Sequence, residues 1–216
     1  MFINHDGIYM DNTKIKAITE WPVPTMVCSV CSFLSLANFY QCFIKDYTML
    51  AKLLTDLTQK DKAFTWGGTE AGTFTQLKHC FTTAPILTYP DNNCQFRLET
   101  DASNSTTGVV LSILKDDKWH PIAFSSHTMS PEEQNYLVGD KEMLSVIHSM
   151  EKWCHYLAGA HHKFEIWNDH INLQWFMKRQ DLNWCQVCWA QYLSHFTFKW
   201  THKARSIMGK VDTLSH

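Results

Sequence analysis

The chain has 216 residues, of which 45% are hydrophobic and 19% are charged. This length suits one large domain or two small ones, and the hydrophobic content is ordinary for a packed globular core. The formal net charge of -2 excludes a strongly basic protein whose overall field attracts nucleic acid. Any such partner must therefore be held by local groups.

The eight cysteines are irregularly spaced and follow no secretory signal, which favours free thiols in a reducing compartment. No apolar run approaches the roughly 18 residues of a membrane span. We therefore expect an intracellular protein of the cytoplasm or nucleus that is neither secreted nor held in a membrane.

The first part of the chain has a helical pattern. Apolar residues recur at helical spacing over residues 10–60, and Pro22 and Pro24 interrupt them, so at least two helices are predicted there. A third helix is predicted over Glu70 to Thr82, and no strand is expected before Pro85.

After Pro90 the pattern changes to that of strands. Phe96, Leu98 and Thr100 alternate with polar residues up to Asp101, which predicts a half-buried strand. Further strands are predicted over Gly108 to Leu114, Trp119 to Ser125, Phe164 to Asp169 and Phe196 to Trp200. The change of period places a domain boundary near residue 92.

Helical segments are interleaved with these strands. Ser130 and Glu133 form a possible capping box ahead of a helix whose apolar residues recur at steps of three and four from Met143 to Leu157. Two more helices are predicted over Ile171 to Met177 and Trp184 to Ser194. The order of elements is that of an α+β domain with a mixed sheet.

Four carboxylates fall at comparable places in this outline. Asp101 and Asp169 end two predicted strands. Glu142 opens the long helix, and Asp212 lies in the tail. Strand ends and helix starts gather at one edge of such a sheet, where converging carboxylates can hold magnesium ions for phosphodiester hydrolysis. Four ordinary surface acids are the alternative.

Several stretches resemble, in order and spacing, the ribonuclease H domain of gypsy-class LTR retrotransposons: LETDASNSTTGVVLS, DKEMLSVIHSMEKWCHYL, FEIWNDHINLQWF and GKVDTLSH. Others resemble the reverse transcriptase thumb and its link to the nuclease: KIKAITEWPVP, SFLSLANFYQCFI and FTWGGTEAGTFTQLKHCFTTAPILTYPD. The resemblance covers nearly the whole chain. It implies a small helical thumb-like region, residues 1–92, and a ribonuclease H-like domain, residues 93–216, with a five-stranded mixed sheet flanked by helices.

The resemblance also implies an endoribonuclease that hydrolyses the RNA strand of RNA/DNA hybrids with two Mg²⁺ ions, for which Mn²⁺ can substitute. Asp101, Glu142, Asp169 and Asp212 match the metal-binding acids of the family. Asp101 is expected to touch both ions. His202 matches a family histidine with a role in product release or proton movement, and a solvated loop histidine is the alternative.

Relatives of this kind are larger polyproteins, whose polymerase aspartates precede the matched stretches. We therefore expect no polymerase activity from this chain alone, and the sequence does not fix an oligomeric state.

The chain departs from the family mainly where the family has arginine: Cys31, Gln41, Cys42, Cys154, Trp184, Cys185, Cys188 and His216. These residues are the products expected when arginine codons lose cytosine or guanine by transition. Our hypothesis is a decaying copy, and finding the same residues in mobile copies would contradict it. A catalytically inactive nucleic-acid-binding remnant is therefore the alternative function.

Two further interpretations stay open. The pairs Cys28 with Cys31 and Cys185 with Cys188 have zinc-ligand spacing, although both fall inside predicted helices. The aromatic residues Trp119, Trp167, Trp175 and Trp200 either pack in the core or contact a duplex. His161 and His162 are expected to form a solvated turn.

Overall fold

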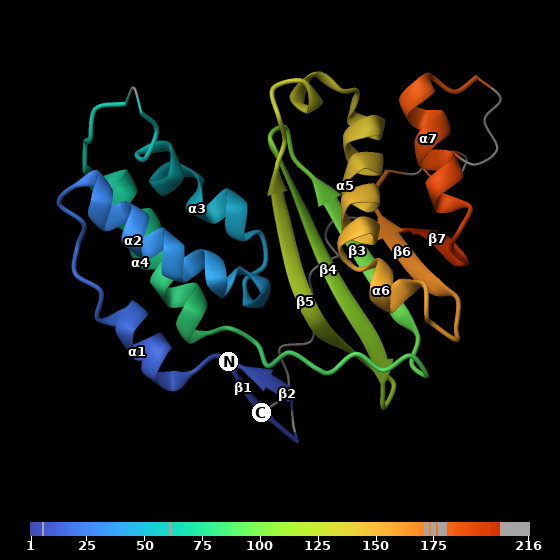
Figure 1. The fold of residues 1–216 in the computed structure, drawn as a ribbon, viewed down its shortest axis with the longest axis horizontal. Helices are drawn as coiled ribbons and strands as arrows, with labels where there is room; N and C mark the ends of the chain where they lie inside the picture. Colours follow the sequence, from blue (N-terminus) through green and yellow to red (C-terminus); the bar gives the residue numbers. More distant parts are fainter. Residues whose placement is uncertain (6, 61, 171–172, 174–175, 177–180, 204–216) are drawn as a thin grey trace.

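Two regions lie side by side along the longest axis of the computed structural model (Figure 1). Helices form one region, and a twisted sheet with helices on its far face forms the other. The structure describes residues 1–203 except residues 6, 61, 171–172, 174–175 and 177–180. Within these residues, no helix is long and apolar enough to cross a membrane.

The helical region confirms the helical pattern of the sequence. Its elements are α1 (Asn12–Thr19), α2 (Val27–Phe39), the short 3-10 helix η1 (Gln41–Phe43), α3 (Tyr47–Asp56) and α4 (Gly68–Thr82). Pro22 and Pro24 lie between α1 and α2, where an extended chain suits them. Phe33 of α2 and Phe74 of α4 pack with ring centroids 4.7 Å apart at the centre of the region.

A small hairpin at the start of the chain was not expected. Its strands are β1 (Phe2–Asn4) and β2 (Gly7–Tyr9), so the prediction of no strand before Pro85 is wrong. Three-residue strands are too short to show an alternating pattern. The hairpin is held from outside, because Ile8 exchanges two backbone hydrogen bonds of 2.7 and 3.1 Å with Leu87 in the link between the regions.

The sheet has the predicted strands and topology. Its strands are β3 (Phe96–Ala102), β4 (Thr106–Lys115), β5 (Lys118–Thr128), β6 (Phe164–Asn168) and β7 (Phe198–His202), in the order β5-β4-β3-β6-β7. The first three form an antiparallel meander, whereas β6 runs parallel to both β3 and β7. The five-stranded mixed sheet is thereby confirmed. The last strand begins at Phe198 rather than at Phe196.

Two aspartates form the turn between β4 and β5. Asp116 and Asp117 have φ angles of 52° and 58°, and Lys115 pairs with Lys118 across the turn. A two-residue hairpin turn needs positive φ at both positions, and aspartate tolerates this better than most residues.

The helices of the sheet region are the 3-10 helix η2 (Glu133–Asn135), α5 (Val138–Lys152), α6 (Cys154–Leu157) and α7 (Trp184–Leu193). The capping box forms, because the backbone amide of Ser130 donates to Glu133 at 2.7 Å and Ser130 Oγ accepts from the backbone of Glu133 at 3.2 Å. However, it caps η2 rather than α5, and the long helix breaks at Trp153. The helix predicted over Ile171 to Met177 lies largely outside the described residues.

Both faces of the sheet are covered. The face toward α5 is an apolar core that includes Phe96, Leu98 and Ile166. Val110 and Phe124 on the other face join the core of the helical region. The prediction that β3 is half-buried is therefore wrong, since its polar residues are covered as well. The division of the chain near residue 92 stays a prediction.

Candidate carboxylate site

Three of the four predicted carboxylates come together at one edge of the sheet. Asp101 lies near the end of β3, and Asp169 directly follows β6. Because β3 and β6 are parallel neighbours, as predicted, both strands deliver their side chains to the same edge. Glu142 reaches this edge from α5, and one carboxylate oxygen from each of the three residues lies within 4.8 Å of the others.

Glu142 is buried and held by two hydrogen bonds. The backbone amide of Ala102 donates to its Oε1 at 3.2 Å, and Nδ2 of Asn168 donates to its Oε2 at 2.7 Å. The Asn168 amide also donates to Thr100 Oγ1 at 3.0 Å, and its Oδ1 accepts from the backbone of His170 at 2.7 Å. This network fixes the carboxylate relative to the ends of β3 and β6.

Asn168 was missed by the sequence analysis, although the sequence contains a signal for it. It shares the parity of the buried residues Phe164 and Ile166 on β6, and it is itself only 3% exposed. A polar residue at an apolar position of an alternating strand needs partners. Here those partners include the carboxylate of Glu142.

Burial raises the pKa of Glu142 from 4.5 to about 7. The negative charges of Asp169 and Asp101 act in the same direction, whereas the hydrogen bond from Asn168 opposes the shift. The repulsion between clustered carboxylates thus contributes to the raised pKa, but burial is the larger cause. A cation at this edge would favour the charged form of all three groups.

His202 lies beside the cluster, at the end of β7. Its Nε2 is 3.0 Å from the backbone oxygen of Asp169, and its backbone pairs with Asn168 in the sheet. Asp212 lies outside the described residues, so its place relative to the other carboxylates stays a prediction.

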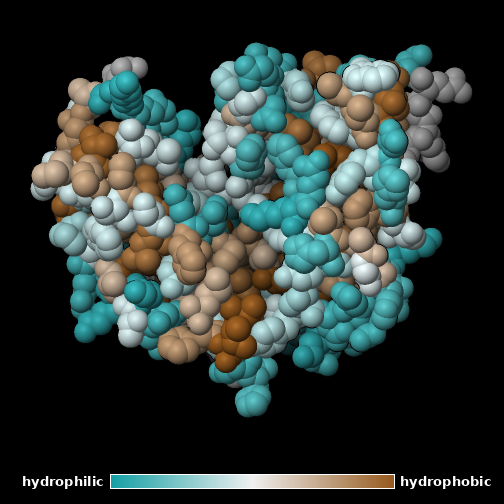
Figure 2. Space-filling view, viewed as in Figure 1, coloured by the Kyte–Doolittle hydropathy of each residue, from teal (hydrophilic) through white to brown (hydrophobic). Residues whose placement is uncertain are grey.

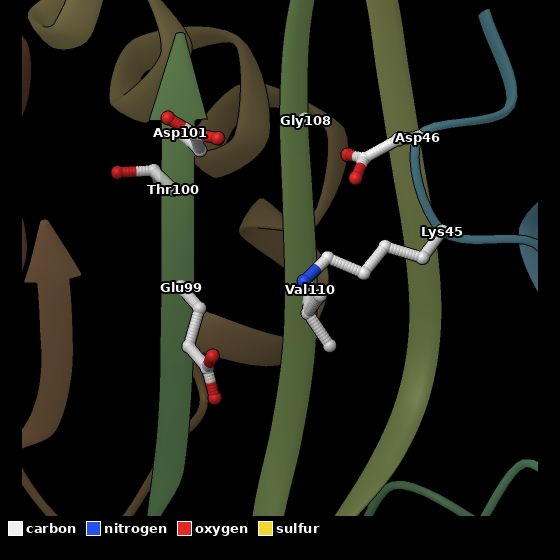
Figure 3. A pocket seen from close by; sticks show the side chains of 7 residues that line it. All are labelled: Lys45, Asp46, Glu99, Thr100, Asp101, Gly108 and Val110. Carbon is white, nitrogen blue, oxygen red and sulfur yellow. The ribbon is translucent and has the colours of Figure 1, made fainter. Parts of the chain in front are cut away.

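A polar cavity of about 220 Å³ adjoins Asp101 on the side of the helical region. Figure 3 shows Lys45 and Asp46 reaching into it from the loop before α3, opposite Glu99 and Asp101 on β3. Asp46 lies directly over Gly108, where a Cβ atom would overlap with its Oδ1. In Figure 2 the two regions appear as lobes separated by a notch at the top of the view.

The other candidates from the sequence do not form a site. Cys28 and Cys31 lie on α2, and Cys185 and Cys188 lie on α7 at the opposite end of the molecule (Figure 1), so they cannot share one zinc ion.

The tryptophans of the sheet are partly buried where they are described. The rings of Trp119 and Trp167 both contact the guanidinium of Arg97, and Trp200 packs against the apolar core of the sheet. Trp175 lies outside the described residues. His161 and His162 are exposed in a turn, as expected.

Comparisons with known proteins agree with this fold. A family model for the RNase H-like domain found in reverse transcriptase matches residues 66–166. The Tf2-3 and Tf2-4 transposon polyproteins of Schizosaccharomyces pombe are each 32% identical to the chain over 216 residues, which is 99% of the chain. The chain spans only 16% of the length of each polyprotein.

Two solved structures have the same fold. A foamy viral protease-reverse transcriptase in complex with an RNA/DNA hybrid has a TM-score of 0.76 at 17% identity, over 99% of this chain and 29% of that one. A related foamy viral structure in complex with double-stranded DNA has a TM-score of 0.77 at 19% identity, over 94% of this chain and 37% of that one. The chain is therefore similar over nearly its whole length to part of retrotransposon polyproteins, and it contains an RNase H-like domain of the kind found in reverse transcriptase.

Proposed function

We propose that the chain hydrolyses the RNA strand of RNA/DNA hybrids at the edge where Asp101, Glu142 and Asp169 meet. The observation that carries this proposal is the convergence of three carboxylate oxygens within 4.8 Å from two parallel strands and a helix. Nothing in the packing of the sheet requires three acids at one point. Their mutual repulsion makes the arrangement unfavourable unless a cation or a bound proton offsets it.

The donor set fits hard divalent cations. The three side chains offer carboxylate oxygens, which Mg²⁺ and Mn²⁺ prefer, and no sulfur or imidazole nitrogen belongs to the described cluster. Asp101, Glu142 and Asp169 would hold the metal, and Asp212 would complete the set. Two such ions activate a water molecule and stabilise the leaving oxygen of a phosphodiester.

The protein contributes orientation and charge control. Asn168 holds Oε2 of Glu142 in place, and its bond to Thr100 ties that carboxylate to the centre of the sheet. With a pKa of about 7, Glu142 keeps a proton in slightly acidic solution and releases it when a cation binds. Metal binding and activity are therefore expected to fall as the pH drops below about 7. His202, beside Asp169, is placed to move a proton or to assist product release.

The proposed substrate is an RNA/DNA hybrid. One foamy viral structure with this fold is a complex with such a hybrid, which supports the same partner class here. RNA offers a 2′-hydroxyl, and the groove of a hybrid differs in shape from that of B-form DNA. Because the net charge is -2, binding depends on local cations and should weaken early as salt rises.

Cleavage of a labelled hybrid tests the proposal directly. The chain should cut the RNA strand in Mg²⁺ or Mn²⁺ at low salt, leave duplex DNA intact, and bind Ca²⁺ without turnover because of its looser coordination. Asp101→Asn keeps the volume of the side chain but removes its charge, so cleavage should fall by at least about 100-fold while hybrid binding changes little. Asp117→Asn, in the distant hairpin turn, is the matched control and should leave cleavage unchanged.

A decayed remnant that binds nucleic acid without cleaving it is the second candidate. Cys31, Cys154, Cys185 and Cys188 stand where the family has arginine, and all four are exposed. Arginine at such positions makes bidentate phosphate contacts that cysteine cannot make. Hybrid binding without Mg²⁺-dependent cleavage at low salt would favour this candidate and contradict the nuclease.

A further inference from the structure

A second cluster of metal-ligating side chains lies away from the three carboxylates. It consists of His127 at the end of β5, Glu133 in η2 and His148 in α5, and one ligand atom from each lies within 4.8 Å of the others. His148 follows Glu142 by six positions on α5, which corresponds to about 9 Å along the helix. The two clusters therefore occupy separate places on one helix.

The three side chains face one another without hydrogen bonding among themselves. Nε2 of His127 lies 3.9 Å from Oε2 of Glu133, and Nε2 of His148 lies 3.9 Å from Oε1 of the same carboxylate. These separations exceed hydrogen-bonding distance. The two imidazole rings meet edge to face with centroids 4.8 Å apart, and an Nε2 atom of each ring lies near the same carboxylate.

Two of the three groups are already held in position. The carboxylate of Glu133 accepts the Ser130 amide at 2.7 Å in the capping box, and this bond fixes its direction. His148 is anchored in the middle of α5, and its side chain is 29% exposed. His127 is 53% exposed, so its ring is free to adjust. Neighbouring ligands of a tetrahedral zinc ion lie about 3.3 Å apart, so small rotations of both imidazole rings toward Glu133 would close the site.

We propose that His127, Glu133 and His148 form a second metal site, which takes Zn²⁺ or a similar borderline dication and not Mg²⁺. Two imidazoles and one carboxylate are a known zinc ligand set, and they leave the fourth position open. Imidazole binds a metal ion in its neutral form.

A groove lies next to the proposed metal site. His127 and His148 line a groove of about 460 Å³, whose other walls include Ser125, Ser149 and Lys152. Lys152 donates to Ser125 Oγ at 2.9 Å across this groove. Because Glu151 and several hydroxyl groups also line the groove, a water molecule suits the open zinc position. The inference does not depend on nuclease activity, because the two clusters share no residue.

Zinc titration of the full chain by equilibrium dialysis tests the proposal. The five exposed cysteines, Cys28, Cys31, Cys154, Cys185 and Cys188, are replaced by serine in all samples, because thiols bind zinc. Saturating Mg²⁺ occupies the carboxylate site. The parent should bind one zinc ion per chain, and zinc should raise its melting temperature.

Single substitutions identify the ligands. His127→Gln and His148→Gln should each weaken zinc binding by more than about 100-fold. This effect exceeds the one usually seen when a hydrogen-bond partner of a metal ligand is removed. His161→Gln, at an exposed turn histidine, is the matched control and should bind zinc like the parent. Since His127 is exposed, its variant should fold even if that of His148 does not. A parent that binds no zinc, or a His127→Gln variant that binds it like the parent, overturns the proposal.

Discussion

The two faces of strand β3 are both buried, but different forces hold them. Phe96 and Leu98 face α5 and are fully covered in an apolar core. On the opposite face, Arg97 and Glu99 are only 5% and 6% exposed, although both carry charge. Asp101 is the next residue of β3 on this second face. The comparison suggests that the strand delivers its carboxylate from a rigid polar layer rather than from a solvated surface.

Arg97 organises this polar layer. It forms an ion pair with Glu99, and its guanidinium lies 4.1 Å from the ring centroids of both Trp119 and Trp167. Burial lowers the pKa of Arg97, while the carboxylates of Glu99 and Glu165 oppose that shift. Contact with two indole rings replaces part of the lost hydration, and arginine is better suited to this than lysine.

The largest effect on stability is expected when the polar face of β3 loses the positive charge of Arg97. Arg97→Ala should lower the free energy of unfolding by about 3–5 kcal/mol, because it removes the guanidinium that forms an ion pair with the buried carboxylate of Glu99. Leu98→Ala, on the apolar face, should lower it by about 2–5 kcal/mol through lost contacts and a cavity. Urea denaturation of both variants makes the comparison.

A double substitution separates the two explanations. Arg97→Met with Glu99→Leu removes both charges and keeps the volume, so it should restore most of the stability lost in Arg97→Ala. If the double variant is as unstable as Arg97→Ala, packing around the tryptophans matters more than the lost ion pair.

The apolar face of β3 also lies near one carboxylate, that of Glu142 on α5. This carboxylate should make the stability of the protein depend on pH. Its pKa is 4.5 in the unfolded reference and about 7 in the metal-free fold, so the folded state keeps a proton that the unfolded chain releases. The contribution of Glu142 to stability is thus fully present below about pH 4.5 and is lost as the pH rises to about 7. The loss amounts to about 3 kcal/mol.

Urea denaturation of the metal-free protein at pH 5 and pH 8 measures this loss. Glu142→Gln should be less sensitive to pH over that range than the parent and more stable than it at pH 8. Mg²⁺ should reduce the pH dependence of the parent, but not that of the variant. An equal pH dependence in both proteins would contradict the assignment to Glu142.

A smaller effect is expected where the helical region touches the sheet. Gly108→Ala places a Cβ atom against Oδ1 of Asp46, so the loop before α3 must shift, at a cost of about 1–3 kcal/mol. Asp46 has a φ of 53°, a conformation that glycine tolerates better. Asp46→Gly should therefore rescue Gly108→Ala in thermal denaturation. A loss that persists in the double variant would place the strain elsewhere.

The smallest effect concerns one of the two stacked rings. Trp119→Leu keeps an apolar side chain but removes the indole face over Arg97, which should lower the free energy of unfolding by about 0.5–2 kcal/mol. In the background of Arg97→Met with Glu99→Leu, the same substitution should have a smaller effect, as measured by a double-mutant cycle. Equal effects in both backgrounds would indicate that the indole only fills space.

The sequence predicts the sheet well because its signals are local. Alternation over Phe96 to Asp101 and the helical spacing after Met143 need only neighbouring residues to be recognised. The convergence of Asp101 and Asp169 followed from the parallel pairing expected of their strands. The covering of Arg97 and Glu99 did not, because it depends on distant tryptophans and on the docking of the helical region.

The same limit explains the features that were missed. The cluster of His127, Glu133 and His148 joins a strand end, a 3-10 helix and a long helix, and no spacing in the sequence indicates this set. Asn168 could have been found from its parity on β6, whereas its bond to Glu142 required the position of α5.

The contact between His202 and Asp169 also restricts the chemistry of the imidazole. A backbone oxygen can only accept a hydrogen bond, so Nε2 of His202 must carry the hydrogen in that 3.0 Å contact. The neutral ring is then the Nε2–H tautomer, and only Nδ1 can take up a further proton. A proton arriving at His202 would thus enter on the side of the ring turned away from Asp169, and nitrogen chemical shifts measured by NMR would report this tautomer directly.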